Sequence, residues 1–165
     1  MALKDYYINI DGNKIKGEAT QEGHKDEIQI QRFEWDAHHE SSVDSQQGQS
    51  TAAVKMNNFR IWKKTCKASP ELMISLAQKI PYKTVKITAS KTAAKKQAIY
   101  LTWTLTNVTI CKYVHRTPDD PKDAIPEEEI HFTFDKIKIE YKPQPDDGAA
   151  LGAAATAEYD YKNRK

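Results

Sequence analysis

A cluster of metal-binding residue types lies in the first third of the chain. It consists of Asp36, His38, His39 and Glu40. On a strand, alternate residues share a face about 7 Å apart, so three of these four side chains would point the same way. A zinc site needs further ligands in tetrahedral geometry, for which His24 and His131 are the candidates. Nothing in the sequence places those two histidines nearby, so we favour a solvated polar strand face over a metal site.

Nucleophilic and phosphate-binding chemistry lacks its usual sequence signatures. No serine is flanked by the glycines of a nucleophile elbow. Cys66 and Cys111 are far apart, without a CxxC spacing or a histidine partner, and we interpret them as buried, reduced thiols. Gly12, Gly17 and Gly23 do not form a phosphate-cradling loop before a helix. The sequence therefore predicts no catalytic residue, no cofactor and no metal.

Charge is nearly balanced along the chain. The 165 residues include 25 Lys+Arg and 23 Asp+Glu, which gives a formal net charge of +2. A dedicated nucleic-acid binder or membrane-surface protein carries a larger positive excess. Lysines gather between residues 83 and 96, and acidic residues gather between 119 and 129. We interpret both groups as solvated surfaces, with charge pairing between subunits of a head-to-tail assembly as the alternative.

Length and composition indicate one folded domain over residues 1–165. Hydrophobic residues make up 39% of the chain, and three Trp, eight Tyr and four Phe are enough to close one core. No apolar stretch is long enough for a membrane-spanning helix, and the first residues lack the apolar core of a signal peptide. We therefore expect the protein to be made and folded in the cytoplasm.

Hydrophobic periodicity predicts a mainly β protein with one helix. We expect strands near residues 6–10, 28–38, 52–63, 82–89, 98–114 and 129–141. The helix is expected over 69–80, where Ser69 would cap it, Pro70 would stand at its first position and Pro81 would end it. Its apolar face would consist of Leu72, Met73, Leu76, Ala77 and Ile80.

Several expected strands change the side on which their apolar residues lie. Ile28 and Ile30 share one parity, whereas Phe33 and Trp35 take the other, and similar switches occur within 54–61, 101–114 and 130–141. Either a bulge or bend inserts the odd residue, or one stretch faces the protein's own core and the next faces another subunit. Both explanations predict a small closed or nearly closed β-barrel of two curled antiparallel sheets with one flanking helix, and the second predicts an oligomer.

Two segments offer little to bury. Residues 40–51 are rich in Ser, Gln and Gly, which predicts a flexible extended loop within the domain. The alanine-rich stretch 149–157 suits either a helix or a strand packed closely on a neighbour.

An ordered set of short motifs resembles the hemolysin-coregulated protein family. The motifs are DYYINIDG at 5–12, KGE at 16–18, HKDEI at 24–28, SPEL at 69–72, YKPQ at 141–144 and DG at 147–148, together with Phe33 and Trp35. The resemblance covers essentially the whole chain in order. It implies a β-barrel-like subunit of a hexameric ring, with rings stacked into the inner tube of a Gram-negative type VI secretion system.

The resemblance also implies partners and a destination. A contracting sheath would expel the tube with its spike protein, so the subunit would reach the medium or a target cell without a signal peptide. The expected partners are further copies of the chain, the spike protein, the sheath, the baseplate and small secreted effectors carried in the lumen. Nucleic acid and membrane insertion are not expected.

Two sets of residues are predicted to serve this assembly. The ring-stacking loop would consist of Ser45, Gln46, Gln47, Gly48, Gln49 and Ser50. Arg32, Glu34 and Asp36 share the parity opposite to Phe33 and Trp35, and we expect them to face the lumen and its effectors. The alternative for these three residues is an ordinary outer face. The alternative function is a secreted β-barrel binding module that captures a peptide, a glycan or a host surface through its mobile loop.

Overall fold

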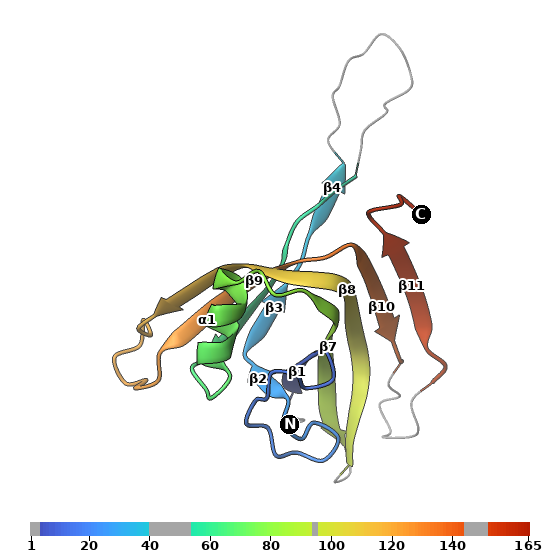
Figure 1. Cartoon of the computed structure of the whole chain (residues 1–165). Helices are drawn as coiled ribbons and strands as arrows, with labels where there is room; N and C mark the ends of the chain where they lie inside the picture. Colours follow the sequence, from blue (N-terminus) through green and yellow to red (C-terminus); the bar gives the residue numbers. More distant parts are fainter. Residues whose placement is uncertain (1–3, 40–53, 94–95, 144–151) are drawn as a thin grey trace.

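The computed structural model describes residues 4–39, 54–93, 96–143 and 152–165, and they form a mainly β structure (Figure 1). The strands are β1 (Lys4–Ile10), β2 (Ile28–Ile30), β3 (Arg32–Glu34), β4 (Ala37–His39), β5 (Val54–Met56), β6 (Phe59–Lys64), β7 (Tyr82–Ala93), β8 (Lys96–Arg116), β9 (Glu127–Thr133), β10 (Lys136–Tyr141) and β11 (Ala155–Asp160). The helix of the described residues is α1 (Ser69–Ala77). The predicted class, mainly β with one helix, is confirmed.

Two curled antiparallel sheets share the long strand β8. The first sheet has the order β2-β1-β7-β8-β10-β11, and the second has the order β8-β9-β6-β3. β9 pairs with residues 109–116 of β8, whereas β10 pairs with residues 101–106. β4 and β5 form a separate ribbon that projects from the body (Figure 1).

The barrel is nearly closed but its hydrogen-bonded ladder is open. The path across both sheets begins at β2 and ends at β3, which are successive segments of chain separated by Gln31. The backbone N–H of Gln31 donates to the carbonyl of Trp62 at 2.8 Å, and this contact brings the chain from the first sheet to the second. Of the two predicted forms, the nearly closed barrel is therefore confirmed and the closed barrel is wrong. The short strand β2 pairs with β1 and has no ladder with β6.

Bends and bulges explain the parity switches. The expected strand 28–38 is divided into β2, β3 and β4, and the expected strand 129–141 is divided into β9 and β10. In β8, Asn107 has a φ of 52°, and the register with β9 shifts between Ile110 and Lys112. The expected strand 52–63 is likewise divided between β5 and β6. These interruptions turn most of the following apolar residues back toward the same core. Val114 is the exception, because it pairs with Glu129 on the outward side of β8.

The core lies between the curled sheets and against α1. Phe59 and Phe132 are 0% exposed, and the ring of Phe33 stacks on that of Phe59. Trp35 packs against Trp103 with ring centroids 5.5 Å apart. Aromatic residues from distant parts of the sequence thus fill the space at which the two sheets meet.

The helix begins with a different cap from the one expected. Ala68 is its N-cap and makes no side-chain cap bond, whereas Ser69 is already helical. The Ser69 hydroxyl instead accepts from the backbone N–H of Cys66 at 3.0 Å and from Lys63 Nζ at 3.2 Å. Ser69 is therefore a buried connection between the helix and β6 rather than its cap.

The helix also ends earlier than residue 80, and its apolar face is narrower than expected. Lys79 takes a left-handed φ of 52°, and the N–H of Ile80 returns to the carbonyl of Ser75, which closes the last turn. Leu72 is buried and Leu76 is half-buried, but Met73 is 48% exposed. The expected positions of Met73 and Ala77 on the buried face were wrong, since both are exposed.

The carboxyl-terminal region forms a strand where it is described. β11 pairs with β10 over six residues, from Lys136 opposite Asp160 to Tyr141 opposite Ala155. The strand alternative therefore holds for residues 155–157, while 149–151 lie outside the described residues. Among the described residues, no helix has the length and apolar character needed to cross a membrane.

Candidate functional site

One side of the second sheet carries polar side chains from neighbouring strands. Along β6 and β9, every second residue is buried in the core, and the residues between them point outward. We call this outward side the polar face. On β3, β6, β9 and the residues directly after β3, it consists of Arg32, Glu34, Asp36, Arg60, Trp62, Lys64, Glu127, Glu129, His131 and Thr133.

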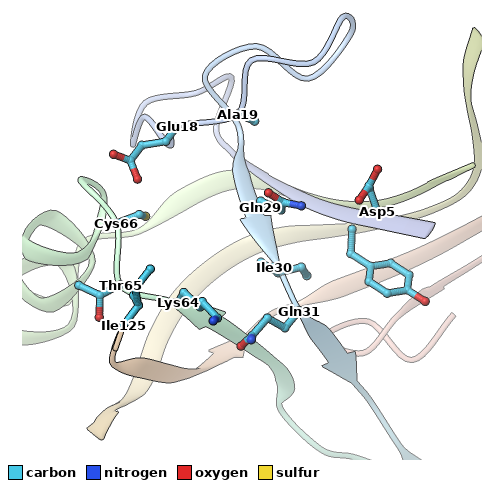
Figure 2. Close-up of a pocket in the computed structure, with 11 residues that line it drawn as sticks. Asp5, Glu18, Ala19, Gln29, Ile30, Gln31, Lys64, Thr65, Cys66 and Ile125 are labelled. Atoms are coloured by element: carbon cyan, nitrogen blue, oxygen red, sulfur yellow. The ribbon is translucent and has the colours of Figure 1, made fainter. Parts of the chain in front are cut away.

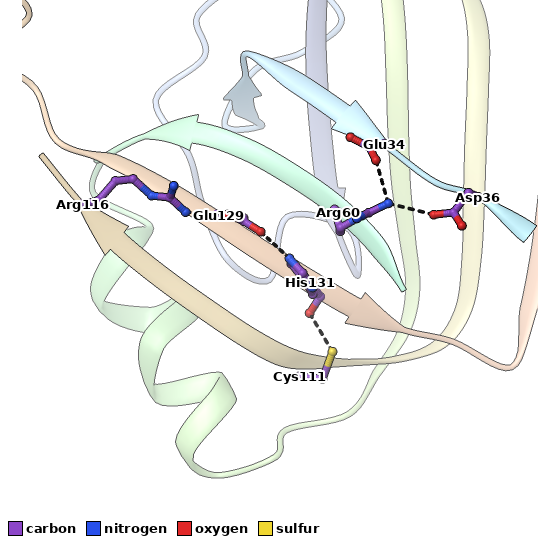
Figure 3. A network of polar contacts seen from close by, with 7 residues as sticks. All are labelled: Glu34, Asp36, Arg60, Cys111, Arg116, Glu129 and His131. Atoms are coloured by element: carbon purple, nitrogen blue, oxygen red, sulfur yellow. Dashed lines mark hydrogen bonds and ion pairs between the residues drawn. The ribbon is translucent and has the colours of Figure 1, made fainter. Parts of the chain in front are cut away.

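Arg60 holds two carboxylates at the β3 edge of the polar face. Its Nη2 donates to Glu34 Oε1 at 2.7 Å and to Asp36 Oδ1 at 2.8 Å (Figure 3). The side chains of Glu34 and Asp36 are 52% and 51% exposed. Because water competes at such exposure, each pair contributes at most about 1 kcal/mol to stability. These two ion pairs therefore set which charges the polar face presents to solvent, and they add little to the stability of the fold.

The three residues predicted to face a lumen all lie exposed on the polar face, but they make different contacts. Glu34 and Asp36 share Arg60, whereas Arg32 stacks on Trp62 with its guanidinium carbon 3.9 Å from the ring centroid. The alternation of residues in the sequence correctly predicted that these three side chains share one side of the sheet. That this side lines a lumen stays a prediction.

A second charged group lies on β9 and β8, with His131 directly opposite Arg60 in the strand register. Glu129 Oε1 lies 2.6 Å from His131 Nε2, and its Oε2 accepts from Arg116 Nη2 at 2.5 Å (Figure 3). The hydrogen bond with His131, followed by the nearby charges of His131 and Arg116, holds the pKa of Glu129 below its ordinary value even though the group is partly buried. Glu129 is therefore an ionised carboxylate at neutral pH.

A buried polar network lies beneath the polar face. Lys63 and Glu128, on the core side of β6 and β9, form an ion pair with side chains that are 0% exposed. The Tyr113 hydroxyl donates to Glu128 Oε1 at 2.7 Å, and Lys63 Nζ also donates to Ser69. Burial favours the neutral acid, but hydrogen bonds from Lys63, Ser69 and Tyr113 outweigh it and lower the pKa of Glu128.

The sequence contained a signal for this network that we did not use. Lys63 has the parity of the buried Phe59 and Ile61, and Glu128 has the parity of the buried Ile130 and Phe132. A charged residue at a core position of each of two strands indicates a buried pair. Treating residues 127–129 as one acidic run hid that alternation.

A cavity of about 600 Å³ opens at the seam between β2 and the end of β6 (Figure 2). It is lined by Asp5, Tyr6, Glu18, Ala19, Gln29, Ile30, Gln31, Lys64, Thr65, Cys66 and Ile125. Lys64 is engaged with Asp123, so its positive charge is compensated. The lining mixes carboxylates, amides and isoleucines, and it lies where the open ladder leaves β2 without a second strand.

The histidines considered for a metal site are dispersed. His24 is 2% exposed, stacks on Tyr7 with ring centroids 4.0 Å apart, and lies 2.7 Å from Glu27 through Nδ1. His131 belongs to the polar face, and His38 is exposed on β4. Glu40 lies outside the described residues. Within the described ranges, no three His, Cys, Asp or Glu side chains gather as a metal site would require.

The interpretation of the cysteines as two buried thiols needs correction. Cys66 is half-buried, and Cys111 is exposed at the bulge of β8; both are free. Cys111 Sγ lies 3.5 Å from the backbone carbonyl of His131, on the polar side of the sheet (Figure 3). The predicted ring-stacking residues 45–50 lie outside the described residues.

Comparisons with known proteins agree on one family. A sequence profile described as "Type VI secretion system effector, Hcp" matches residues 7–141. The chain is similar to "Protein hcp1" of Pseudomonas aeruginosa, with 26% identity over 148 residues that cover 90% of this chain and 89% of that protein.

Solved structures show the same fold. A structure described as that of "a type six secretion system protein" matches with a TM-score of 0.88 and 26% identity over 99% of both chains. A type VI secretion system effector from Yersinia pestis matches with a TM-score of 0.70 and 28% identity, covering 94% of this chain and 99% of that one. Hcp1 from Salmonella typhimurium shares the fold, with a TM-score of 0.76 and 24% identity over 100% and 99% of the two chains.

Proposed function

The chain belongs to the Hcp family of type VI secretion system tube proteins, and from this premise we propose that six copies close into a ring and that rings stack into a tube. The tube would be expelled by the sheath together with the spike protein, after assembly on the baseplate. In this function the protein is a structural subunit and a carrier of small secreted effectors, without catalysis.

The observation that carries the ring proposal is the pair of unpaired edges on the second sheet. Among the described residues, β3 pairs with β6 alone, and residues 109–116 of β8 pair with β9 alone. One copy therefore offers a strand edge at each end of a four-stranded sheet. Edges of this kind accept another strand, and joining unlike edges head to tail closes a ring when the rotation is right.

The layers of the subunit favour the polar face as the wall of the lumen. The core side of the second sheet is covered by the first sheet and by α1 (Figure 1). In a ring, the bulkier layers fit on the outside, where the circumference is larger. The polar face would then line the pore, where its charged side chains would keep passengers from adhering through apolar contacts.

Solution mass and imaging test the ring. Light scattering coupled to size-exclusion chromatography should give six times the mass of one chain, and a cross-section image should show sixfold symmetry around a pore. A monomeric mass would contradict the ring and favour the alternative of a binding module with a single loop-borne site.

The stacking of rings is tested by deleting residues 45–50, the segment predicted to make the contact between rings. The ribbon of β4 and β5 projects from the body, which supports a contact between rings at that end (Figure 1). Deleting residues 45–50 should leave hexamers but abolish tubes and secretion. Normal secretion by the deletion variant would refute the stacking role.

Effector carriage is tested by a charge reversal on the polar face. Glu34→Lys should change effector retention in pull-downs while the ring mass stays sixfold. Glu22→Lys, at an exposed position of the first loop, is the matched control and should retain effectors like the unaltered protein. Equal retention by all three proteins would contradict the assignment of this face to the lumen.

A further inference from the structure

Trp62 is an aromatic side chain among charged neighbours on the polar face. It lies between Arg32 of β3 and Glu129 of β9 in the strand register, and it is half-buried rather than packed in the core. The guanidinium carbon of Arg32 stands 3.9 Å from the centroid of its ring. At this distance a planar cation stacks directly on the aromatic face.

Arg32 differs from Arg60 and Arg116 in whether a carboxylate of the described residues pairs with its guanidinium group. Arg60 holds Glu34 and Asp36, and Arg116 holds Glu129. Within the described part of the chain, Arg32 has no carboxylate within ion-pair distance, and its contact is the Trp62 ring. The stack therefore presents a solvated positive charge that no carboxylate of the described residues pairs, so it is open to a carboxylate from outside the subunit.

The chemistry of the stack selects one kind of ligand. Stacking occupies a flat side of the guanidinium and leaves N–H donors at its edge, in the fork geometry that matches a carboxylate. The indole ring fixes the orientation of the fork and keeps water from one side of it. We propose that the Arg32–Trp62 stack is the point at which the tube lumen binds acidic, extended segments of carried proteins.

The inference rests on the proposed ring, in which the stack would be repeated six times around the pore. One exposed carboxylate–guanidinium contact is weak in water. A segment with several carboxylates that reaches more than one stack gains affinity through effective concentration, without any new kind of contact. The site would thus prefer passengers with a run of Asp or Glu over passengers with isolated acidic residues.

The test uses the assembled protein and two synthetic probes. Its sixfold mass is first verified by light scattering. Binding of a fluorescein-labelled peptide of alternating Glu and Gly, and of its Lys counterpart, is then measured by fluorescence anisotropy at low salt. We expect the Glu peptide to bind the unaltered ring, Arg32→Gln to weaken that binding by about tenfold or more, and the Lys peptide to bind neither ring.

Matched variants distinguish peptide binding at the Arg32–Trp62 stack from general electrostatic attraction to the ring. Lys86→Gln removes the same charge from an exposed position of β7, in the first sheet, and should bind the Glu peptide like the unaltered ring. Arg32→Lys keeps the charge but loses the fork and the stacking, so its affinity should fall between those of the unaltered ring and Arg32→Gln. Binding of an unlabelled Glu peptide should also change the fluorescence of Trp62, and Trp62→Phe should remove that change.

The outcomes distinguish this inference from the ring itself. A sixfold mass with equal peptide binding by the unaltered protein and Arg32→Gln would overturn the inference and leave the ring standing. An equal loss in Lys86→Gln would mean general electrostatic attraction and would also overturn it. Disassembly of Arg32→Gln would place Arg32 in a contact between subunits and would overturn the inference, and a monomeric unaltered protein would end both proposals.

Discussion

β6 carries an ion-pairing residue on each side of the second sheet, and the two ion pairs differ in burial. The Lys63 and Glu128 side chains are 0% exposed, whereas those of Arg60 and Glu34 are 28% and 52% exposed. The buried pair has a tyrosine and a serine as further hydrogen-bond partners. The exposed pair is in contact with water. Two residues of one strand, Arg60 and Lys63, thus have different roles: Lys63 stabilises the fold on the core side, and Arg60 organises charge on the polar face.

Breaking the buried pair should produce the largest effect. Lys63→Met leaves the Glu128 carboxylate in the core without its cation, and we expect a loss of about 3–5 kcal/mol in the free energy of unfolding. Urea denaturation followed by far-UV circular dichroism measures it. The double variant Lys63→Met/Glu128→Leu should recover most of the loss, because no uncompensated charge remains. A single-variant loss below about 1 kcal/mol would show that the pair is solvated.

Removing apolar packing at the helix should produce the next largest loss in the free energy of unfolding. Leu72 is 1% exposed, so Leu72→Ala should cost about 2–5 kcal/mol through lost burial and a cavity. Met73 is its neighbour on the exposed side, and Met73→Ala should stay within about 0.5 kcal/mol. Similar losses in the two variants would contradict the observed orientation of α1. Leu76→Ala should lie between them, since Leu76 is half-buried.

Acid should remove the stability that two carboxylates contribute, one on each side of the second sheet. The folded-state pKa values of Glu128 and Glu129 both lie below the ordinary 4.5. Each group therefore contributes stability that is fully present above about pH 4.5 and is lost as the pH falls through its folded-state pKa. In denaturation curves measured from pH 7 downward, Glu128→Gln and Glu129→Gln should each flatten the acid decline. A decline as steep as that of the unaltered protein would contradict the lowered pKa of the group replaced.

The exposed pair should give the smallest effect. Arg60→Ala should change the free energy of unfolding by about 1 kcal/mol or less, and the change should shrink further at high salt. A double-mutant cycle with Glu34→Ala isolates the coupling between the two side chains. Coupling above about 2 kcal/mol would mean that the polar face is part of the stabilising core rather than a surface for ligands.

Local pattern was enough to predict several elements. The 3.6-residue spacing and Pro70 located the helix near residue 69, and period-two alternation located the main strands. Parity also placed Arg32, Glu34 and Asp36 on a common side. The helix cap was mistaken because Ser69 is engaged by Lys63 and Cys66, contacts that capping statistics do not include.

Contacts between strands distant in sequence could not be obtained in this way. Tyr113 reaches Glu128 because β8 and β9 are neighbours, and the register that places Tyr113 opposite Ile130 follows the bulge before Lys112. A shift of one residue would send the side chain to the other side of the sheet. Arg32 likewise meets Trp62 only because β3 and β6 pair in one register.

The sequence by itself determined the mainly β class, the single helix of the described residues, the common side of the polar residues on β3 and, through its ordered motifs, the family. Period-two and 3.6-residue patterns are local, so they can be interpreted without knowing which strands meet. Only the tertiary structure decided that the barrel stays open between β2 and β6, that Lys63 and Glu128 are buried together, and that Arg32 rests on Trp62. These outcomes depend on the order and register of the strands, which are set by the joint packing of both sheets around one core.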